Sequence, residues 1–331
     1  MTLILGSEDV RRCVNIPSLM TVVETALRES ARGGVVQPER LNLRYGESFF
    51  RMMPALLNES RLMGYKVFHG SGKTGVRYLL ALYDQEDGSL LALMDAHYLT
   101  AARTGAATGV ATRYLSRPDS SRVAVFGSGL EARTNFEAVC AVRQVKSAKV
   151  YSTNPERRKG FAGEMTRLQG LPVEPVDSPE ACADGADIVI VATNTMGRPS
   201  QIAFEGRWMR PGMHVNSIGS TAAFLREIDA ETFGRADVIA VDAPPAQIEL
   251  ESGDVMDALQ SALYRRERVV EIQSVLAGTA AGRSRPEDIT LYKSVGSAMQ
   301  DVVSGYAVFL EATRRSLGID VGDFLEKKFV I

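Results

Sequence analysis

From about residue 120 to residue 241, short apolar runs alternate with segments of helical periodicity. The apolar runs are mostly continuous Val and Ile, which is typical of strands buried on both faces of a parallel sheet. We expect strands at 122–126, 148–152, 187–192, 213–218 and 237–241, with helices at 130–143, 155–169 and 178–184. This strand–helix–strand order predicts right-handed βαβ units of an α/β domain. Pro118 and the polar residues after it mark the expected start of that domain.

The residues before this region have a different pattern. An amphipathic helix is predicted at 7–33, ending at Gly33-Gly34. Strand-like segments follow at 41–45, 48–53, 63–69 and 76–83, and Asp87-Gly88 forms a hairpin turn before a strand at 89–94. These segments predict an antiparallel or mixed sheet. Thr100 is expected to cap a helix at 101–115. A further helix with one apolar face is expected at 294–316, and the pattern leaves open on which domain it packs.

The first strand of the α/β pattern leads directly into a Gly-x-Gly-x-x-Ala motif. Gly127 permits the tight turn, Gly129 lets the backbone approach a pyrophosphate, and Ala132 lets the next helix pack closely on the strand. The exposed N–H groups at the helix start, at Ser128 and Leu130, would hold the phosphates with the help of the helix dipole. The motif therefore predicts dinucleotide binding. The alternative is a Rossmann-like domain that has no nucleotide.

The second strand of the same pattern bears on the choice of nicotinamide cofactor. An acidic residue about 20 positions after the glycines favours NAD, but Asn154 stands in this place. Arg157 and Arg158 follow, and either would attract a 2′-phosphate. The sequence thus favours NADP(H). NAD(H) is the alternative, because Glu156 could face the ribose and because basic residues are common on exposed helical turns.

The composition of the chain limits the kinds of partner that it is expected to bind. The chain has 331 residues, of which 45% are hydrophobic, and a formal net charge of −2, which suits about two globular domains. Near-neutral charge gives no electrostatic case for nucleic acid or an anionic membrane surface. No apolar run approaches the roughly 18 residues that span a bilayer. We therefore expect a small-molecule partner, with no nucleic acid and no membrane.

Cysteine and histidine positions add two further expectations. The three cysteines are odd in number and far apart, and the N-terminal segment lacks the basic stretch of a signal peptide, so we expect reduced thiols and a cytoplasmic protein. The histidines show no metal-ligand spacing, so no metal site is expected. Only His69, three positions after Lys66, is a candidate for a place near a site.

Three basic residues outside the nucleotide loop stand out, namely Arg40, Lys66 and Arg103. Lys66 is flanked by apolar residues in a predicted strand, and a charge in such a place needs a partner or a function. Taken one at a time, each is better explained as a surface or salt-bridged cation.

Taken together, these residues lie in segments that resemble the ornithine cyclodeaminase/μ-crystallin family. The similarity runs in order through nearly the whole chain and includes the Gly127 loop. The other matching segments are Gln37-Pro38-x-Arg40, Met53-Pro54-Ala55, Gly64-x-Lys66, Gly88–Asp95, Leu99-Thr100-x-x-Arg103-Thr104, Ala186–Val189, Pro211–Gly219, Arg226–Asp229, Glu251–Asp254 and Lys293–Gly296.

The resemblance implies a Rossmann-type parallel-sheet domain inserted into a mixed α+β substrate-binding and dimerisation domain. We place the Rossmann domain at 118–305 and the other domain at 1–117 plus 306–331, and we expect a homodimer. The resemblance also implies that Arg40, Lys66 and Arg103 hold a substrate carboxylate beside the nicotinamide. The residues that it implies as cofactor contacts are Thr193, Ile218, Gly219 and Ser294.

One departure from the family pattern affects the predicted reaction. Cyclodeaminases of the family carry an Asp where this chain has Thr221, and a threonine cannot accept a proton near neutral pH. The sequence therefore favours NAD(P)H-dependent reduction of a 2-imino acid (a ketimine), or the reverse amino acid dehydrogenation, on a small imino or amino acid. The alternatives are an ornithine-type cyclodeaminase with bound NAD and a non-catalytic, crystallin-like NADPH-binding protein.

Overall fold

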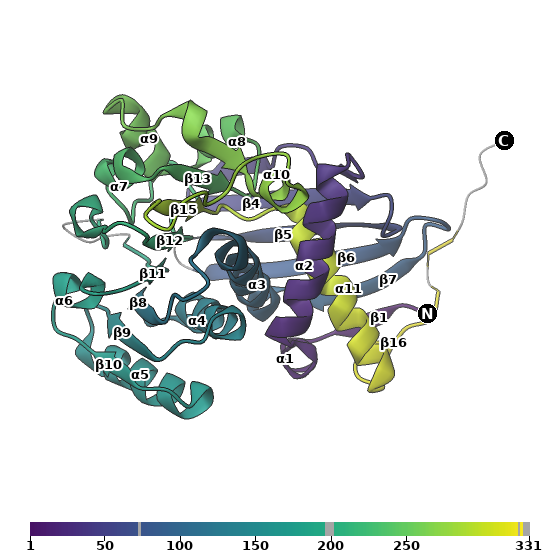
Figure 1. The fold of residues 1–331 in the computed structure, drawn as a ribbon. Helices are drawn as coiled ribbons and strands as arrows, with labels where there is room; N and C mark the ends of the chain where they lie inside the picture. The colour runs from purple at the N-terminus through teal and green to yellow at the C-terminus, as the bar shows by residue number, and fades with distance from the viewer. Residues whose placement is uncertain (72–73, 196–201, 324, 327–331) are drawn as a thin grey trace. The chain divides into compact units, whose positions relative to one another are not determined.

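The computed structural model describes residues 1–71, 74–195, 202–323 and 325–326. The chain forms two compact units: unit 1 comprises Met1–Arg103 and Ser297–Ile331, and unit 2 comprises Thr104–Gly296 (Figure 1). Unit 2 is thus inserted into unit 1, and the predicted α/β class, a Rossmann-type sheet within a mixed α+β domain, is confirmed.

The division between the units differs from the boundaries at 117/118 and 305/306 expected from the sequence. Helix α3 (His97–Leu115) crosses the first division, so Pro118 marks the end of a helix and not the change of unit. Helix α11 (Ala298–Arg314) lies entirely in unit 1, whereas a boundary at residue 305 would have cut it in two. An uninterrupted helix gives no composition change at which a sequence reading could place such a division.

Unit 1 is built on a mixed sheet. Its strand order is β16-β1-β7-β6-β5-β4-β2, with β3 paired to β4, and every pair is antiparallel except β1 with β7. The predicted hairpin turn at Asp87-Gly88 joins β6 to β7. The strands are β1 (Leu3–Leu5), β2 (Val35–Val36), β3 (Leu41–Tyr45), β4 (Ser48–Leu57), β5 (Leu62–Ser71), β6 (Gly75–Asp84), β7 (Leu90–Asp95) and β16 (Ile319–Asp320).

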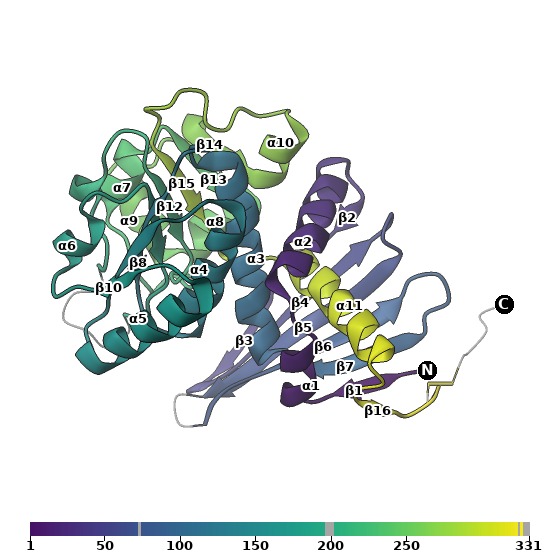
Figure 2. The same cartoon turned by 60° about the horizontal axis from the view of Figure 1, so that its bottom comes forward.

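Helices α2 and α11 pack together on one face of this sheet (Figure 2). The single helix expected at 7–33 is wrong: the chain forms α1 (Ser7–Cys13) and α2 (Ile16–Ala31). Asn15 begins the second helix, because its side chain accepts a hydrogen bond from Ser18 N at 2.9 Å. Thr100 is not a cap either, since it lies inside α3 and donates to the Ala96 carbonyl.

Unit 2 is a parallel sheet in the order β10-β9-β8-β11-β12-β15-β13-β14. The expected strands and helices are present to within one or two residues, whereas β10, β14 and β15 were not predicted. The strands are β8 (Arg122–Phe126), β9 (Ser147–Tyr151), β10 (Val173–Pro175), β11 (Ile188–Val191), β12 (His214–Ser217), β13 (Val238–Val241), β14 (Val269–Glu271) and β15 (Thr290–Lys293). The helices that lie wholly within this unit are α4 (Leu130–Val142), α5 (Pro155–Gln169), α6 (Pro179–Ala183), α7 (Ala230–Arg235), α8 (Pro245–Glu251), α9 (Gly253–Gln260) and α10 (Ile272–Ala277).

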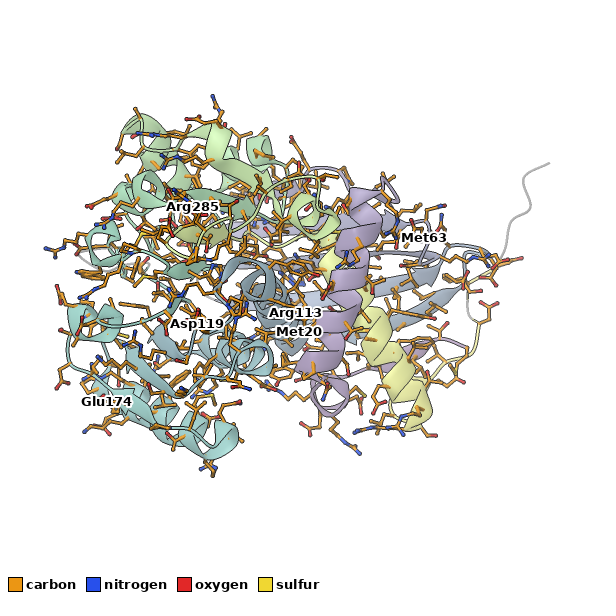
Figure 3. The ribbon with its side chains drawn as sticks, in the orientation of Figure 1. Met20, Met63, Arg113, Asp119, Glu174 and Arg285 are labelled. Carbon is orange, nitrogen blue, oxygen red and sulfur yellow. The ribbon has the colours of Figure 1, made fainter. Side chains whose placement is uncertain are left out.

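Both faces of the unit 2 sheet are covered, which explains the continuous apolar runs. Val123 and Val125 pack in one core with Phe136 of α4, and Phe126 packs in a second core on the other face. At the sheet edge, Glu174 of β10 is exposed (Figure 3) and is followed by Pro175, and both residues discourage further strand pairing. Within the described residues, no helix is both long and apolar enough to cross a membrane.

Strand order reverses between β8 and β11. The chain builds outward from β8 through β9 to β10, and then returns to the other side of β8 as β11. In open α/β sheets, ligands bind at such a point, beyond the carboxyl ends of the strands. The fold therefore singles out the turns after β8 and β11.

Candidate active site

The three basic residues singled out from the sequence come together in unit 1. Lys66 on β5 is 1% exposed, and its Nζ lies 2.7 Å from both carboxylate oxygens of Asp301 on α11. Arg103, on α3, donates from Nε to Asp301 Oδ1 at 2.8 Å. One carboxylate therefore joins two of the predicted substrate residues.

The loop that carries Arg40 is tied to the same helix. Gln37 Oε1 accepts a hydrogen bond from Met299 N at 3.2 Å, in the first turn of α11. Arg40 is 9% exposed, and its charge is among those that lower the pKa of Lys66. The segment Gln37-Pro38-x-Arg40 thus delivers a third buried cation to the cluster.

The cluster carries excess positive charge. Burial, together with the charges of Arg103 and Arg40, lowers the pKa of Lys66 to about 7, although Asp301 opposes this shift. In the part of the chain that the structure describes, the cluster brings Lys66, Arg103 and Arg40 together with the carboxylate of Asp301, so an anionic group of a ligand would be stabilised there. A lysine with a pKa near neutral can also donate or accept a proton at physiological pH.

Asp301 was missed from the sequence. It is 1% exposed and belongs to the first turn of α11, where Ser297 and Gln300 form a capping box. Gln300 Oε1 also accepts from Arg103 Nη1 at 3.3 Å. The sequence signal that could have identified Asp301 was its acidic side chain on the apolar side of the helix expected at 294–316.

His69 does not belong to this cluster. It is exposed, its position on β5 has the opposite parity to that of Lys66, and its ring stacks on Phe50. On the face of Lys66, the next side chain is Phe68, whose ring centroid lies 5.7 Å from Lys66 Nζ and 5.3 Å from that of Tyr78. An aromatic wall therefore borders the lysine on one side.

In unit 2, the glycine loop follows β8 at the strand-order reversal. Gly127 has φ +115°, and a Cβ there would lie 2.2 Å from Ala192 O, so the turn requires glycine. Gly129 precedes α4 and provides no side-chain cap, and a Cβ on it would meet nothing within 4 Å. Ala132 is fully buried against the strand. The space beside Gly129 at the start of α4 is thus open, as the close approach of a phosphate requires.

The other residues of this loop are partly engaged. Ser128 Oγ donates to Ser152 Oγ at 3.0 Å, which links the turns after β8 and β9. Leu130 is the first residue of α4 and is half-buried.

The basic residues after β9 differ in environment. Asn154 caps α5, accepting from Arg157 N at 2.9 Å. Arg158 is buried, where it pairs with Asp177 and donates to the Ser152 carbonyl, so it is occupied within the protein. Arg157 is exposed on the first turn of the helix. Of the two arginines, Arg157 is the one placed to meet a ligand.

The remaining predicted cofactor contacts follow the next strands at the same sheet edge. Thr193 comes after β11, Ile218 and Gly219 come after β12, and Ser294 comes after β15. Ile218 is buried. Ser294 Oγ donates at 2.6 Å to the buried carboxylate of Asp242, which also accepts from the N–H groups of Val295 and Gly296. The fold thus gathers the predicted cofactor residues along one edge.

Thr221 is half-buried in the loop that follows β12 and belongs to no helix or strand. Asp229, a second carboxylate considered in place of Thr221, caps α7 by accepting from Thr232 N at 3.0 Å. Among the residues that the structure describes, no group of three His, Cys, Asp or Glu side chains is arranged to hold a metal ion.

Comparison with known proteins supports the resemblance. The profile of the ornithine cyclodeaminase/mu-crystallin family matches residues 1–315. A Δ1-pyrroline-2-carboxylate reductase of Bacillus cereus is 27% identical over 325 residues, covering 96% of this chain and 98% of that protein.

Two solved structures have the same fold across the chain. The Δ1-pyrroline-2-carboxylate reductase of Thermococcus litoralis, in complex with NADH and L-proline, is 32% identical with a TM-score of 0.90, and covers 96% of this chain and 100% of that one. An archaeal alanine dehydrogenase dimer with bound NAD is 30% identical with a TM-score of 0.88, and covers 98% of this chain and 99% of that one. The chain therefore belongs to the ornithine cyclodeaminase/mu-crystallin family.

Proposed function

We propose that this protein catalyses the NAD(P)H-dependent reduction of a 2-imino acid to the amino acid, together with the reverse oxidation. The observation that carries this proposal is the buried cluster of unit 1, in which Asp301 pairs with both Lys66 and Arg103 and in which Lys66 has a pKa of about 7. The family membership and the similarity to a reductase that holds NADH and L-proline support it.

The residues of the cluster have distinct roles in this proposal. Arg40 and Arg103 bind the substrate carboxylate, because guanidinium forks fix a carboxylate in one orientation. Lys66 donates the proton that the imine nitrogen gains when the C=N bond is reduced, and takes it back in the oxidation. Asp301 holds the Lys66 ammonium in place through its carboxylate oxygens.

Unit 2 supplies the nucleotide site. The uncapped start of α4 after Gly129 suits a pyrophosphate, and the bound nicotinamide supplies the hydride that reduces C2 of the imino acid. The exposed Arg157 favours NADP(H), because it is available for a 2′-phosphate. NAD(H) is the alternative, since the solved relatives above hold NADH or NAD.

Thr221 separates this proposal from cyclodeamination. A hydroxyl offers a hydrogen bond to the substrate nitrogen but no base near neutral pH. Imine reduction needs only the proton that Lys66 supplies, whereas amine elimination needs a further acceptor. We therefore rank an ornithine-type cyclodeaminase second, and a non-catalytic nucleotide-binding protein third.

A homodimer and a cytoplasmic location complete the proposal. Leu41, Leu43 and Tyr45 alternate along β3 and are 49%, 53% and 92% exposed, so they form an apolar row on one face of that strand. Exposed apolar rows of this kind mark protein interfaces, and the alanine dehydrogenase relative is a dimer. The free cysteines are consistent with a reducing compartment.

The test measures consumption of NADPH and of NADH with Δ1-pyrroline-2-carboxylate, with Δ1-piperideine-2-carboxylate and with pyruvate plus an amine. The proposal predicts cofactor oxidation with at least one of them and its loss in Lys66→Ala. Release of ammonia from ornithine without added cofactor would instead establish the cyclodeaminase. Tight NADPH binding with no turnover on the panel would establish the binding protein.

A further inference from the structure

A buried carboxylate ties together two turns of the predicted cofactor edge in unit 2. Glu227 is fully buried, and its Oε1 accepts from Gly219 N and from Ser217 Oγ, each at 2.7 Å. Its Oε2 accepts from Thr193 N and Thr193 Oγ1, each at 3.3 Å. One side chain thus binds the turn after β11 and the turn after β12.

The carboxylate is held by a buried ionic network. Lys293 Nζ lies 3.9 Å from Glu227 Oε1, 3.1 Å from Asp254 Oδ2 and 2.9 Å from Ser217 Oγ, and the three charged side chains are fully buried. Asp254 Oδ1 also accepts from Glu227 N at 2.8 Å. The pKa of Glu227 is raised, by burial first and by the charge of Asp254, against the opposing effects of Lys293 and of the hydrogen bonds that the carboxylate accepts. A charge in this environment persists only because it is paired and hydrogen-bonded.

The two turns are packed closely on this carboxylate. A Cβ on Gly219 would lie 2.3 Å from Glu227 Oε2 and 2.5 Å from Thr193 O. No side-chain atom other than hydrogen therefore fits between Gly219, Glu227 and Thr193. Because Glu227 is fully buried, it acts on a ligand only through the turns that it holds.

The position of these turns identifies the part of the cofactor they serve. In a Rossmann-type sheet, the half with the first three strands binds the adenosine part, and the half beyond the reversal binds the other mononucleotide. Thr193 and Gly219 follow β11 and β12, which lie beyond the reversal at β8. Loops that are fixed before binding save the entropy of ordering them on the ligand.

We propose that Glu227 is a positioning residue for the nicotinamide half of the cofactor, through its hydrogen bonds to Thr193 and Gly219. This inference rests on the proposed function only in so far as a nicotinamide dinucleotide binds at this edge. It assigns a role to Glu227 within the segment Arg226–Asp229.

The test is a titration of Glu227→Gln with two ligands, using whichever of NADPH and NADH the wild type binds more tightly, and ADP-ribose, which lacks the nicotinamide. The glutamine amide keeps the shape of the side chain. Its NH2 group, however, faces either the two donors of Thr193 or the donors of Gly219 and Ser217, and it cannot accept their hydrogen bonds. We expect the dissociation constant of the reduced dinucleotide to rise about tenfold, the effect of losing one hydrogen bond to a charged group. The constant for ADP-ribose should change less than about twofold by the same reasoning.

Glu249→Gln is the matched control, because it makes the same acid-to-amide change in unit 2 at a carboxylate that pairs with Arg266. It should bind both ligands as the wild type does. If Glu227→Gln does not fold, Glu227→Asp, which withdraws the carboxylate by one methylene, is titrated in its place with the same expectation.

The inference is overturned if the variant binds both ligands with wild-type constants, or if both constants rise equally, which indicates general loosening of unit 2. An equal loss in Glu249→Gln would overturn it as well. A wild-type protein that binds ADP-ribose and the reduced dinucleotide but reduces no imine would contradict the proposed function alone. A wild type that binds neither ligand would contradict both.

Discussion

Lys66 and Asp301 are 235 positions apart in the chain, yet the lysine Nζ lies 2.7 Å from the aspartate carboxylate. The pair joins β5 to the first turn of α11, and both side chains are almost completely buried. A buried ammonium that has a pKa of about 7 and is paired with a fixed carboxylate has the properties of a proton donor that is held in one orientation.

Replacing Lys66 tests this role directly. Lys66→Met keeps most of the side-chain volume and removes the proton, so we expect kcat for imine reduction to fall by about 10² or more. The dissociation constant of the cofactor, measured by titration, should stay unchanged. His69→Ala, on the other face of the same strand, is the control and should retain kcat. A Lys66→Met variant with at least half the wild-type kcat would contradict the assignment.

The pKa of Lys66 sets the pH dependence. Imine reduction requires the protonated lysine, so its rate should fall about tenfold per pH unit above a midpoint near 7. Amino acid oxidation requires the neutral form and should rise over the same range to a plateau. The two pH–rate profiles, recorded on the same preparation, should therefore change in opposite directions as the pH rises. Profiles that are flat from pH 6 to pH 9 would count against Lys66 as the proton donor.

Asp301→Asn should move the midpoint of the reduction profile. The carboxylate raises the pKa of Lys66 against the effect of burial and of the neighbouring arginines, so its loss lowers that pKa further. We expect the midpoint to shift to lower pH by about one unit or more. Ser304→Ala, a buried polar change on the same helix, should leave the midpoint in place. An unchanged midpoint in Asp301→Asn would show that the carboxylate does not act on Lys66.

The two glycines of the loop after β8 should respond differently to alanine. Gly127→Ala places a Cβ against Ala192 O at a positive φ, so we expect a large loss of stability, measured by thermal unfolding. Gly129→Ala meets no protein atom and should leave the unfolding midpoint almost unchanged while weakening dinucleotide binding at least about tenfold. Wild-type dinucleotide affinity in Gly129→Ala would argue against phosphate binding at this turn.

Arg157 should discriminate between the two cofactors. Arg157→Gln removes the exposed guanidinium and should raise the KM for NADPH about tenfold, with the KM for NADH unchanged. Lys159→Gln, an exposed basic residue on the same helix, is the control, and its salt bridge to Glu156 shows that it is occupied elsewhere. If the wild type already prefers NADH, the NADP(H) assignment is wrong whatever the variant does.

Much of unit 2 could be predicted from the sequence, because continuous apolar runs and the glycine loop report local structure. Strand β8 and helix α5 were expected at the residues where they occur. Strand β15 was missed, because its sequence Thr-Leu-Tyr-Lys includes Lys293, whose buried charge is paired with residues far away in the chain. Local pattern does not reveal a pairing of that kind.

The site was predicted in part for the same reason. Lys66 was recognisable as a cation in an apolar strand, but its partner Asp301 lies on a helix at the other end of the chain. Glu227 and Asp254 were visible only as parts of matching segments, since nothing local shows that they meet at Lys293. Arg158 shows the converse case: the sequence offered it beside Arg157 for a phosphate, and only its burial against Asp177 shows that it is occupied.

The most direct test of the account follows the hydride itself. The protein is given Δ1-pyrroline-2-carboxylate and NAD(P)H carrying deuterium at both C4 positions of the nicotinamide, and the product is analysed by mass spectrometry. We expect proline with a single deuterium at C2 and one equivalent of oxidised cofactor. Proline without deuterium, or no proline at all while ornithine loses ammonia with no net consumption of cofactor, would contradict imine reduction by this protein.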